Sequence, residues 1–460
     1  MHKIKEKGWS EKIFKAYDIR GAYPAEINED AAYKIARAFA RYLNIGNAEG
    51  RVLKIVLSDD ARESSPALKE AFMDGLIDEG VEIIDAGLTT TPMHYFAVNV
   101  SEADGGAMIT ASHLPMEFNG LKLSKKGAMP LSEGAGMEEI KGDAVRGIFA
   151  SAARNETLPG PSLEEGGEEK INLPAKIDFT NDYIEFLSNY FPYLEKEIKK
   201  MVSGGKIAGI SFDTDEDRAM FDDEKGNRVP GDIITALLVR YFAKTADKNS
   251  LAHSGLLALN PLYGGSDAHT SSGMRSPFAF LSAIIYDLRS SRVVREEIEK
   301  YGMHPVESRV GHAFIKPLML KENAVFGGEV SGHYYFKDFF YCDSGIFSAL
   351  AVLDLMRTEK KKLSELVKPL QKYAKTEELN FTVEEKEKAL DRVAAHFDGE
   401  KISYLDGVTV SRWDGVPEGE RWWFNLRLSN TENLVRLNLE AAIPELLEEK
   451  KKLISELLQN

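Results

Sequence analysis

The hydrophobic and polar positions follow one another in patterns that predict strands and helices in a regular order. Residues 51–58, RVLKIVLS, and 81–87, VEIIDAG, have the short apolar runs of strands, and residues 65–80 between them have helical hydrophobic spacing. This order predicts a βαβ unit with parallel strands. A further strand is predicted at 106–110, and it leads directly into the turn ASHLP. Because ligands bind at the carboxyl ends of strands in open α/β sheets, this turn is a candidate part of a site.

Further blocks of the same kind follow along the chain. Residues 206–212, KIAGISF, predict a strand that enters an acidic loop, and RAMFDD after the loop predicts another strand. A third α/β block is predicted from a helix, a strand and a helix at residues 312–322, 323–329 and 344–358. The strands RWWFNLRLSN and VRLNLEAA and a closing helix at 443–460 predict a small α+β domain. The polar stretch 151–170, rich in Gly, Pro, Ser and Glu, is the best candidate for a linker.

Length and composition are those of a soluble globular protein with several domains. The chain has 460 residues, of which 43% are hydrophobic and 28% are charged, and about three or four domains are expected at this length. The net charge of -15 disfavours nucleic acid as a partner, because binding to a phosphate backbone needs a basic surface. Apolar runs such as ALLVRYFA are shorter than the ~20 residues of a membrane-spanning helix. No membrane partner is therefore expected.

Two further features favour the cytoplasm. The segment MHKIKEKGWSEKIFKAYD lacks the apolar core of a secretory signal and contains acidic residues that a transit peptide avoids. Cys342 is the only cysteine, which excludes an intrachain disulfide and a cysteine-based zinc site. A reducing compartment is therefore expected.

The acidic loop FDTDEDRAMF places Asp213, Asp215, Glu216 and Asp217 between apolar residues. Two like charges about 4 Å apart cost roughly 4 kcal/mol at an effective dielectric near 20, so a positive partner is expected. A flat strand or a helix would spread the three aspartates apart, whereas a curled loop would bring them together. Carboxylates without nearby His or Cys favour Mg²⁺, Mn²⁺ or Ca²⁺ over zinc. A solvated acidic turn is the alternative, and an EF-hand is disfavoured because Arg218 follows the aspartates where that motif requires Gly.

Three other segments contain residues suited to a phosphorylated sugar. Arg, Ser, Asn and Thr side chains suit phosphate, and Glu, Ser and His suit sugar hydroxyls. Each segment alone also fits an ordinary turn or cap, but together they predict a sugar-phosphate site. The segments are TASHLP with Ser112 and His113, followed by NGLK with Lys122; GGEVSGH with Glu329, Ser331 and His333; and RLSNTENLVR with Arg427, Ser429, Asn430 and Thr431.

These segments together resemble the α-D-phosphohexomutase family, in its phosphomannomutase/phosphoglucomutase group. The family's opening Tyr-Asp-Ile-Arg-Gly is present at 17–21, and its phosphoserine, metal, sugar and phosphate loops are similar to TASHLPMEFNGLK, DTDEDR, GGEVSGH and RLSNTENLVRLNLE. The resemblance covers most of the chain. It implies an α/β fold of four domains around a central cleft, with three related α/β domains and a smaller α+β C-terminal domain. The expected domains are residues 1–160, 171–249 with possible completion by 250–283, 284–372, and 373–460.

The resemblance also implies an activity. The enzyme would move a phosphoryl group reversibly between the 1- and 6-positions of a hexose phosphate, through a phosphoserine at Ser112 and a hexose 1,6-bisphosphate, which also serves as activator. One Mg²⁺ would be shared by the phosphoryl oxygens on Ser112 and by Asp213, Asp215 and Asp217. Electrostatic stabilisation and positioning dominate phosphoryl transfer, which agrees with this set of residues.

The resemblance implies roles for further residues. His113, Lys122 and His333 are all candidate proton carriers, and the sequence does not decide among them. Arg20 and Arg218 would steady the phosphoserine. The substrate-binding set implied by the family consists of Tyr17, Arg289, His312, Glu329, Ser331, Arg427, Ser429, Asn430, Thr431 and Arg436.

The chain also departs from the family pattern. Thr214 stands where the metal loop usually has Gly, which predicts local strain because a β-branched residue resists positive φ; Leu114 and Asn433 replace the usual Asn and Pro. Only about thirty residues separate Tyr183 from Asp213, too few for a full second α/β unit. LLALNPLYGGSDA, within the long segment 250–283, resembles the usual opening of that domain. We therefore expect a rearranged second domain, natural or engineered, in which residues 256–270 add a strand.

Several alternatives remain open at this point. Mannose and glucose phosphates are the favoured substrates, with glucosamine phosphate as an alternative, and both a monomer and a homodimer fit. A haloacid-dehalogenase-like phosphatase would use Asp213 as nucleophile, and a non-catalytic relative would bind sugar phosphate without turnover. A Ser-His hydrolase is disfavoured, because neighbouring turn residues rarely bring an imidazole to the adjacent hydroxyl and no G-x-S-x-G surrounds Ser112.

Overall fold

The computed structural model describes most of the chain, and the chain divides into two compact units. The described residues are 8–45, 47, 50–146, 174–256, 282–429 and 433–459, without the side chains of 245–256. Unit 1 consists of residues 1–219, 249–272 and 338–350, and unit 2 of residues 220–248, 273–337 and 351–460. No helix in the described ranges is both long enough and apolar enough to cross a membrane.

Unit 1 is built on a seven-stranded sheet of order β1-β5-β4-β2-β3-β7, with β6 paired to β5. Strand β2 runs parallel to β3 and β4, and β5 runs antiparallel to β4 and β1. The predicted βαβ unit is therefore confirmed. The strands are β1 Ile19–Ala22, β2 Lys54–Asp59, β3 Glu82–Leu88, β4 Gly105–Ile109, β5 Phe118–Lys125, β6 Met129–Pro130 and β7 Ala175–Lys176.

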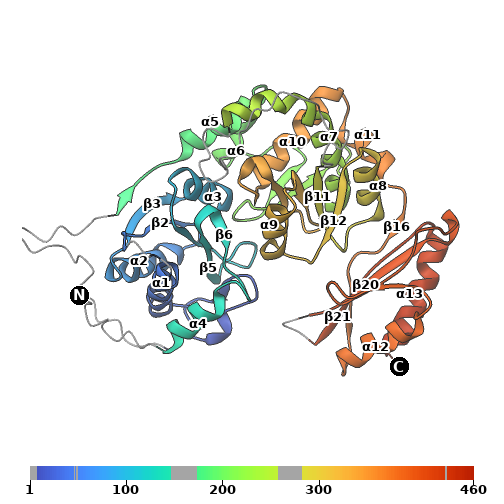
Figure 1. The fold of residues 1–460 in the computed structure, drawn as a ribbon, viewed down its shortest axis with the longest axis horizontal. Helices are drawn as coiled ribbons and strands as arrows, with labels where there is room; N and C mark the ends of the chain where they lie inside the picture. Colours follow the sequence, from blue (N-terminus) through green and yellow to red (C-terminus); the bar gives the residue numbers. More distant parts are fainter. Residues whose placement is uncertain are drawn as a thin grey trace, which may run out of the picture. The chain divides into compact units, whose positions relative to one another are not determined.

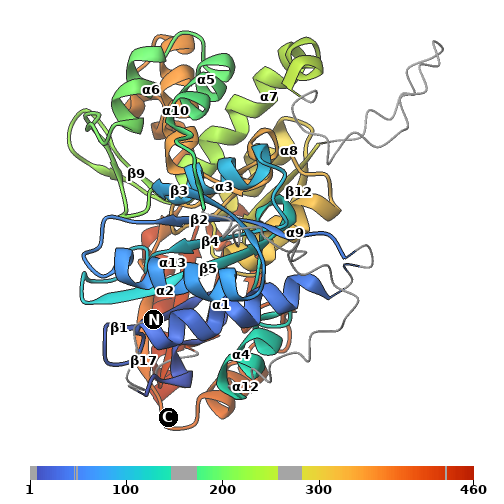
Figure 2. The same cartoon turned by 90° about the vertical axis from the view of Figure 1, so that its left-hand side faces the viewer.

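Helices cover both faces of this sheet: α3 (Thr91–Val100) lies on one face, and α1 (Glu29–Asn44) and α2 (Ser65–Asp78) lie on the other (Figure 2). Asn28 caps α1 and Thr90 caps α3 through their side-chain oxygens, which satisfies N–H groups that a helix start leaves unpaired. Buried side chains of α1 and α2 form one hydrophobic core with β2, β4 and β5. Helix α4 spans Met137–Arg146.

Two short helices, α5 (Thr180–Tyr190) and α6 (Glu195–Val202), precede the acidic loop. The strand predicted at 206–212 exists but is confined to β8, Ile210–Phe212. The next strand is β9 (Ala219–Asp222), which pairs with β10 (Arg228–Val229). Helix α7 runs over Gly231–Leu256, so the strand expected at 256–270 lies outside the described residues except for Leu256 at the end of α7. The expected linker at 151–170 also lies outside them.

Unit 2 contains most of the predicted third α/β block, while β15 (Cys342–Asp343) and the residues of α10 (Gly345–Glu359) up to Leu350 belong to unit 1. Its strands β12, β11, β13 and β14 are neighbours in that order, with β11 parallel to β12 and β13. The predicted elements at 312–322, 323–329 and 344–358 correspond to α9, β13 and α10. The elements of the block and of the segment after it are β11 Ala283–Asp287, α8 Arg292–Lys300, β12 His304–Ser308, α9 His312–Lys321, β13 Phe326–Gly328, β14 Tyr334–Phe336, β15 Cys342–Asp343 and α10 Gly345–Glu359.

The C-terminal part of unit 2 is an antiparallel sheet of order β16-β21-β20-β19-β18, with β17 paired to β21. Helices α12 and α13 cover one face of it (Figure 1) and bury side chains against β20 and β21. This is the predicted α+β arrangement. Its elements are α11 Leu363–Val367, β16 Ala374–Lys375, β17 Leu379–Thr382, α12 Lys386–His396, β18 Lys401–Ser403, β19 Val408–Arg412, β20 Trp422–Leu428, β21 Leu434–Ala441 and α13 Pro444–Gln459.

Candidate active site

The loop between β8 and β9 curls and brings three carboxylates together. One carboxylate oxygen each of Asp213, Asp215 and Asp217 lies within 4.8 Å of the other two. The left-handed residue of the loop is Glu216, with φ of 59°, and Thr214 is absent from the residues with positive φ. The expectation of strain at Thr214 was wrong, because the loop makes its turn two residues later.

Two elements of unit 1 hold this loop in place. Thr91, at the start of α3, donates from its Oγ1 to Asp215 Oδ2 over 2.8 Å and from its backbone N–H to the Asp215 carbonyl over 2.9 Å. Gly345, at the start of α10, donates its N–H to the Glu216 carbonyl over 3.0 Å. A Cβ at Gly345 would lie 2.6 Å from the Arg218 carbonyl oxygen, so the close approach requires glycine.

The acidic cluster has the electrostatics of a cation site. Burial, and then the charges of Asp217 and Asp215, raise the pKa of Asp213 to about 8. Lys122, on β5, brings its Nζ to 2.6 Å from Asp215 Oδ2 and also contacts Asp217. Burial alone would lower the pKa of Lys122, but these two carboxylates outweigh burial and raise it. Lys122 is therefore part of the positive charge that the sequence led us to expect, in addition to being a candidate proton carrier.

The three aspartates fit a hard divalent cation. Asp215 Oδ1 is buried and has no hydrogen-bond partner in the part of the chain that the structure describes. A buried carboxylate oxygen without a partner is costly, and a metal ion would satisfy it. The donor set consists of carboxylates alone, which is the chemistry that Mg²⁺ prefers.

Ser112 lies in the turn after β4 and reaches the acidic loop. Its Oγ donates to Asp213 Oδ2 over 3.2 Å. The residue is 1% exposed and has a left-handed φ of 52°, a conformation that is uncommon for a residue other than glycine and that concentrates at functional sites. The structure thus brings together the serine and the aspartates that the sequence singled out separately.

His113 lies beside the serine hydroxyl, with its Nδ1 3.4 Å from Ser112 Oγ. Neighbouring turn residues were expected only rarely to bring an imidazole to the adjacent hydroxyl, and this turn is one of the cases in which they do. Burial, and then the charges of Arg218 and Arg20, lower the pKa of His113 to about 4. The imidazole is therefore neutral at neutral pH and able to accept a proton.

Arg20 and Arg218 also belong to this part of unit 1. Arg20 lies on β1 opposite Gly120 of β5 and forms an ion pair with Asp18. Arg218 donates its backbone N–H to Asp213 Oδ1 over 3.2 Å, and its Nε lies 3.6 Å from Asp213 Oδ2. Tyr17 is half-buried directly before Asp18.

The expected sugar loop lies in unit 2. Glu329 is 1% exposed, and its carboxylate accepts hydrogen bonds of 2.8 Å each from the Gly311 N–H and the Tyr335 hydroxyl. Ser331 Oγ lies 2.9 Å from His333 Nδ1. His312 directly follows Gly311 at the start of α9. The Glu329 carboxylate thus connects the expected sugar loop to Gly311, directly before α9.

The expected phosphate-binding cations gather around a carboxylate that the sequence did not single out. Glu378 lies 3.4 Å from both Arg427 and Arg436, and 4.0 Å from Arg289. Arg289 is also held by Asp287 at 2.8 Å. Ser429 donates its N–H to the Leu434 carbonyl over 2.9 Å, where the loop between β20 and β21 begins and ends. The two remaining residues of the predicted set, Asn430 and Thr431, lie outside the described residues.

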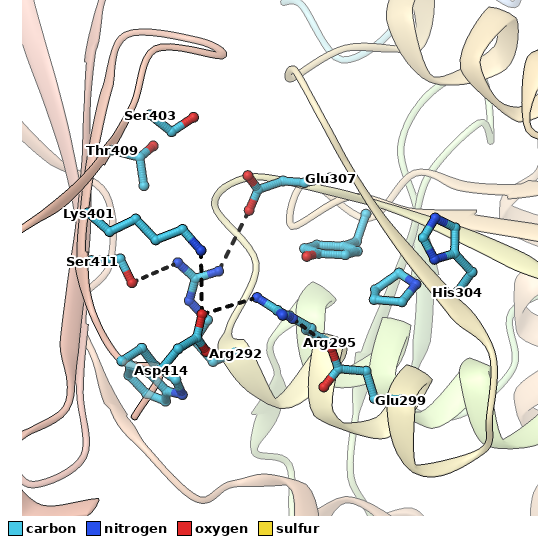
Figure 3. A pocket seen from close by; sticks show the side chains of 13 residues that line it. Arg292, Arg295, Glu299, His304, Glu307, Lys401, Ser403, Thr409, Ser411 and Asp414 are labelled. Carbon is cyan, nitrogen blue, oxygen red and sulfur yellow. Dashed lines mark hydrogen bonds and ion pairs between the residues drawn. The ribbon is translucent and has the colours of Figure 1, made fainter. Parts of the chain in front are cut away.

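A separate pocket of about 410 Å³ lies in unit 2 among α8, β12, β18 and β19 (Figure 3). Residues of the predicted site are absent from its lining. Its three cations are matched by three carboxylates, and the pairs are Arg295 with Glu299 at 2.8 Å, Lys401 with Asp414 at 3.4 Å and Arg292 with Glu307 at 3.7 Å. Because these charges neutralise one another, the pocket offers no surplus positive charge to a phosphate.

Comparisons with known proteins agree with the sequence segments. Three family descriptions of phosphoglucomutase/phosphomannomutase match: alpha/beta/alpha domain I at residues 11–147, alpha/beta/alpha domain III at 268–373, and the C-terminal domain at 378–456. The phosphomannomutase of Salmonella montevideo is 32% identical, with 97% of this chain and 99% of the relative covered. The phosphomannomutase of Vibrio cholerae is 34% identical, with coverage of 96% and 98%.

A solved structure shares the fold. The phosphoglucomutase/phosphomannomutase family protein of Burkholderia thailandensis has a TM-score of 0.73 and 22% identity, with 98% of both chains covered. The identity and coverage of the relatives show the family, and this structure shows that the chain has the α/β multi-domain fold of that family. The chain therefore belongs to the α-D-phosphohexomutase family, in the phosphomannomutase/phosphoglucomutase group of isomerases.

Proposed function

We propose that this hexose phosphate mutase moves a phosphoryl group between the 1- and 6-positions of mannose or glucose phosphate, with Ser112 as the phosphoryl carrier. The observation that carries the proposal is the approach of Ser112 Oγ to the acidic cluster, 3.2 Å from Asp213 Oδ2. Ser112 would give its phosphoryl group to the free hydroxyl of the substrate, whose proton passes to His113, Lys122 or His333. The resulting hexose 1,6-bisphosphate would reorient in the site and return its other phosphoryl group to Ser112. The serine would then be phosphorylated again at the end of the cycle.

Asp213, Asp215 and Asp217 would hold Mg²⁺ together with the Ser112 phosphoryl oxygens. When bound, the ion supplies charge stabilisation to the transferring phosphoryl group. Arg20 and Arg218 are close enough to His113 to lower its pKa, and we propose that they bind phosphoryl oxygens beside it. A neutral His113, 3.4 Å from Ser112 Oγ, is well placed as one of the proton carriers.

The groups of unit 2 would bind the rest of the substrate. Arg289, Arg427 and Arg436 already surround a carboxylate, which supports binding of the non-reacting phosphate by the same cations. The remaining members proposed for this role are Tyr17, His312, Glu329, Ser331, Ser429, Asn430 and Thr431. We further propose four domains, at residues 1–160, 171–249 with 250–283, 284–372 and 373–460. The protein would act in the cytoplasm on hexose phosphates, as a monomer or a homodimer.

Two alternatives receive less support. A haloacid-dehalogenase-like phosphatase would use Asp213 as nucleophile, but both carboxylate oxygens of Asp213 already accept hydrogen bonds, from the Ser112 hydroxyl and the Arg218 N–H. A non-catalytic sugar-phosphate-binding protein would not need a buried serine with left-handed backbone beside three aspartates. Glucosamine phosphate remains the alternative substrate within the family.

A coupled assay tests the proposal. The protein is incubated with Mg²⁺ and a trace of hexose 1,6-bisphosphate, and turnover of mannose, glucose and glucosamine 1-phosphates is compared. We expect turnover of mannose 1-phosphate and glucose 1-phosphate that depends on Mg²⁺. Turnover of glucosamine 1-phosphate alone would select the alternative substrate, and release of inorganic phosphate without isomerisation would contradict the mutase assignment.

A further inference from the structure

The guanidinium of Arg62 is buried under the turn that carries Ser112. Arg62 lies three residues after the end of β2, and its side chain is 0% exposed. Its Nη2 donates to the carbonyls of Ser112 over 2.6 Å and Leu114 over 2.8 Å. Its Nη1 donates to the carbonyls of Pro115 over 2.7 Å and Phe118 over 3.0 Å.

The fifth N–H of Arg62 is also used. Its Nε donates to Asp60 Oδ2 over 3.0 Å. A guanidinium has five N–H donors in a fixed plane, so each donor has one acceptor and none is left for a substrate. Asp60 is held in turn by the Ser65 hydroxyl at 2.6 Å, and Asn119 Nδ2 donates to Ser65 Oγ over 3.0 Å. This network fixes the orientation of the guanidinium.

The four carbonyls come from one turn and converge on one cation. Such an arrangement curls the backbone from residue 112 to residue 118 around Arg62, and it orients the Ser112 carbonyl toward the interior. Ser112 has a φ of 52°, which is costly outside glycine and persists only where surrounding contacts enforce it. The Arg62 bonds on both sides of His113, to Ser112 and Leu114, supply such contacts.

We propose that Arg62 is a positioning residue for phosphoryl transfer, which holds the Ser112 turn in the conformation that points Oγ at the aspartate cluster. The proposal rests on the proposed function of Ser112 as phosphoryl carrier. Lysine cannot replace this arginine, because its ammonium has three donors on one nitrogen. It cannot make the five hydrogen bonds that the planar guanidinium makes. A displacement of about 1 Å at the reacting atom is enough to slow a reaction about 10²-fold.

The test compares Arg62→Lys with a matched control. Lys69→Met removes a half-buried cation of unit 1, whose Nζ donates to Asp59 over 2.6 Å and to Asp85 over 2.8 Å, both of them outside the Ser112 turn. Thermal unfolding, kcat, KM and the phosphorylated fraction of Ser112 by intact mass are measured for both variants. We expect Arg62→Lys to lower kcat about 10²-fold with KM within about threefold of the original value. Lys69→Met lowers thermal stability but leaves kcat within about twofold.

Each outcome separates this inference from the proposed function. If the unsubstituted protein carries no phosphate on Ser112, the proposed function fails. If it carries phosphate and Arg62→Lys keeps its kcat, or if Lys69→Met loses kcat equally, the positioning role is overturned. Should Arg62→Lys not fold, Asp60→Asn serves instead, because it loosens the guanidinium without touching the turn. A roughly tenfold loss of kcat at constant KM supports the inference, and an unchanged kcat refutes it.

Discussion

Ser112 Oγ donates a hydrogen bond of 3.2 Å to Asp213 Oδ2, although 101 positions separate the two residues in the chain. The contact joins the turn after β4 to the loop after β8. Both partners are largely buried, and the aspartate belongs to a cluster of three carboxylates that calls for a cation. A phosphoryl group on this hydroxyl would therefore lie next to the metal ligands.

Replacement of Ser112 by Ala is expected to abolish mutase turnover. The substitution removes the group that would carry the phosphoryl, and loss of a nucleophile commonly costs at least about 10⁴-fold in kcat. The coupled assay with mannose 1-phosphate measures it. Ser124→Ala is the matched control, because Ser124 on β5 is also buried, and its hydroxyl donates to the Gly106 carbonyl and not to the acidic cluster. Turnover that survives in Ser112→Ala would refute the serine assignment.

Replacement of Asp215 by Asn is expected to weaken Mg²⁺ binding. It removes one anionic ligand and disturbs the carboxylate that Thr91 and Lys122 orient. We expect kcat at low Mg²⁺ to fall about 10²-fold, with partial recovery as Mg²⁺ is raised. Asp223→Asn is the control, because Asp223 closes the turn after β9 and is not a member of the cluster. Equal effects of the two substitutions would contradict a metal site at Asp215.

Replacement of Glu378 by Gln is expected to tighten phosphate binding. In the structure Glu378 competes for the cations of Arg427 and Arg436, each at 3.4 Å. A partly exposed ion pair contributes up to ~1 kcal/mol, so KM should fall by about three- to fivefold. The exposed neighbour Glu377 provides the control variant Glu377→Gln. A raised KM for Glu378→Gln alone would show instead that this carboxylate orients the arginines for substrate.

His94 is expected to make the stability of unit 1 depend on pH. Burial, and then the charge of Lys122, lower the pKa of His94 to about 3, and its Nδ1 lies 2.8 Å from Ser58 Oγ. The unfolded chain takes up a proton near pH 6.5, whereas the folded chain does not. The His94 contribution to stability is therefore complete above pH 6.5 and is lost as pH falls from 6.5 toward 3, by at most ~1.4 kcal/mol per pH unit.

Thermal unfolding measured between pH 7 and pH 5 tests this dependence. His94→Gln keeps a polar group near Ser58 but cannot take up a proton, so its unfolding temperature should depend less on pH than that of the unsubstituted protein. An identical pH dependence of the two proteins would show that other groups cause it.

The hydrophobic pattern was sufficient for most of the fold, because the buried strands and amphipathic helices of both units follow local periodicity. β2, α2 and β3 lie within a few residues of their predicted bounds. The strand at 206–212 was predicted too long, because only three residues of that segment are paired. Asp213, Asp215 and Asp217 could be singled out because close like charges in a loop require a partner.

Other site residues left no comparable signal in the sequence. Thr91 reaches Asp215 across 124 positions, and Arg62 bonds backbone carbonyls, which any residue type supplies. Glu378 is one acid among many until the fold places it beside Arg427 and Arg436. Contacts that depend on tertiary structure, or on backbone groups alone, cannot be read from residue types along the chain.

Phosphopeptide mapping after incubation with hexose 1,6-bisphosphate tests the central claim most directly. The account predicts one acid-stable phosphoryl group on the peptide that contains Ser112, which is removed when glucose 1-phosphate or mannose 1-phosphate is added. A phosphoryl group on the peptide that contains Asp213, labile as an acyl phosphate is, with Ser112 unmodified, would contradict it.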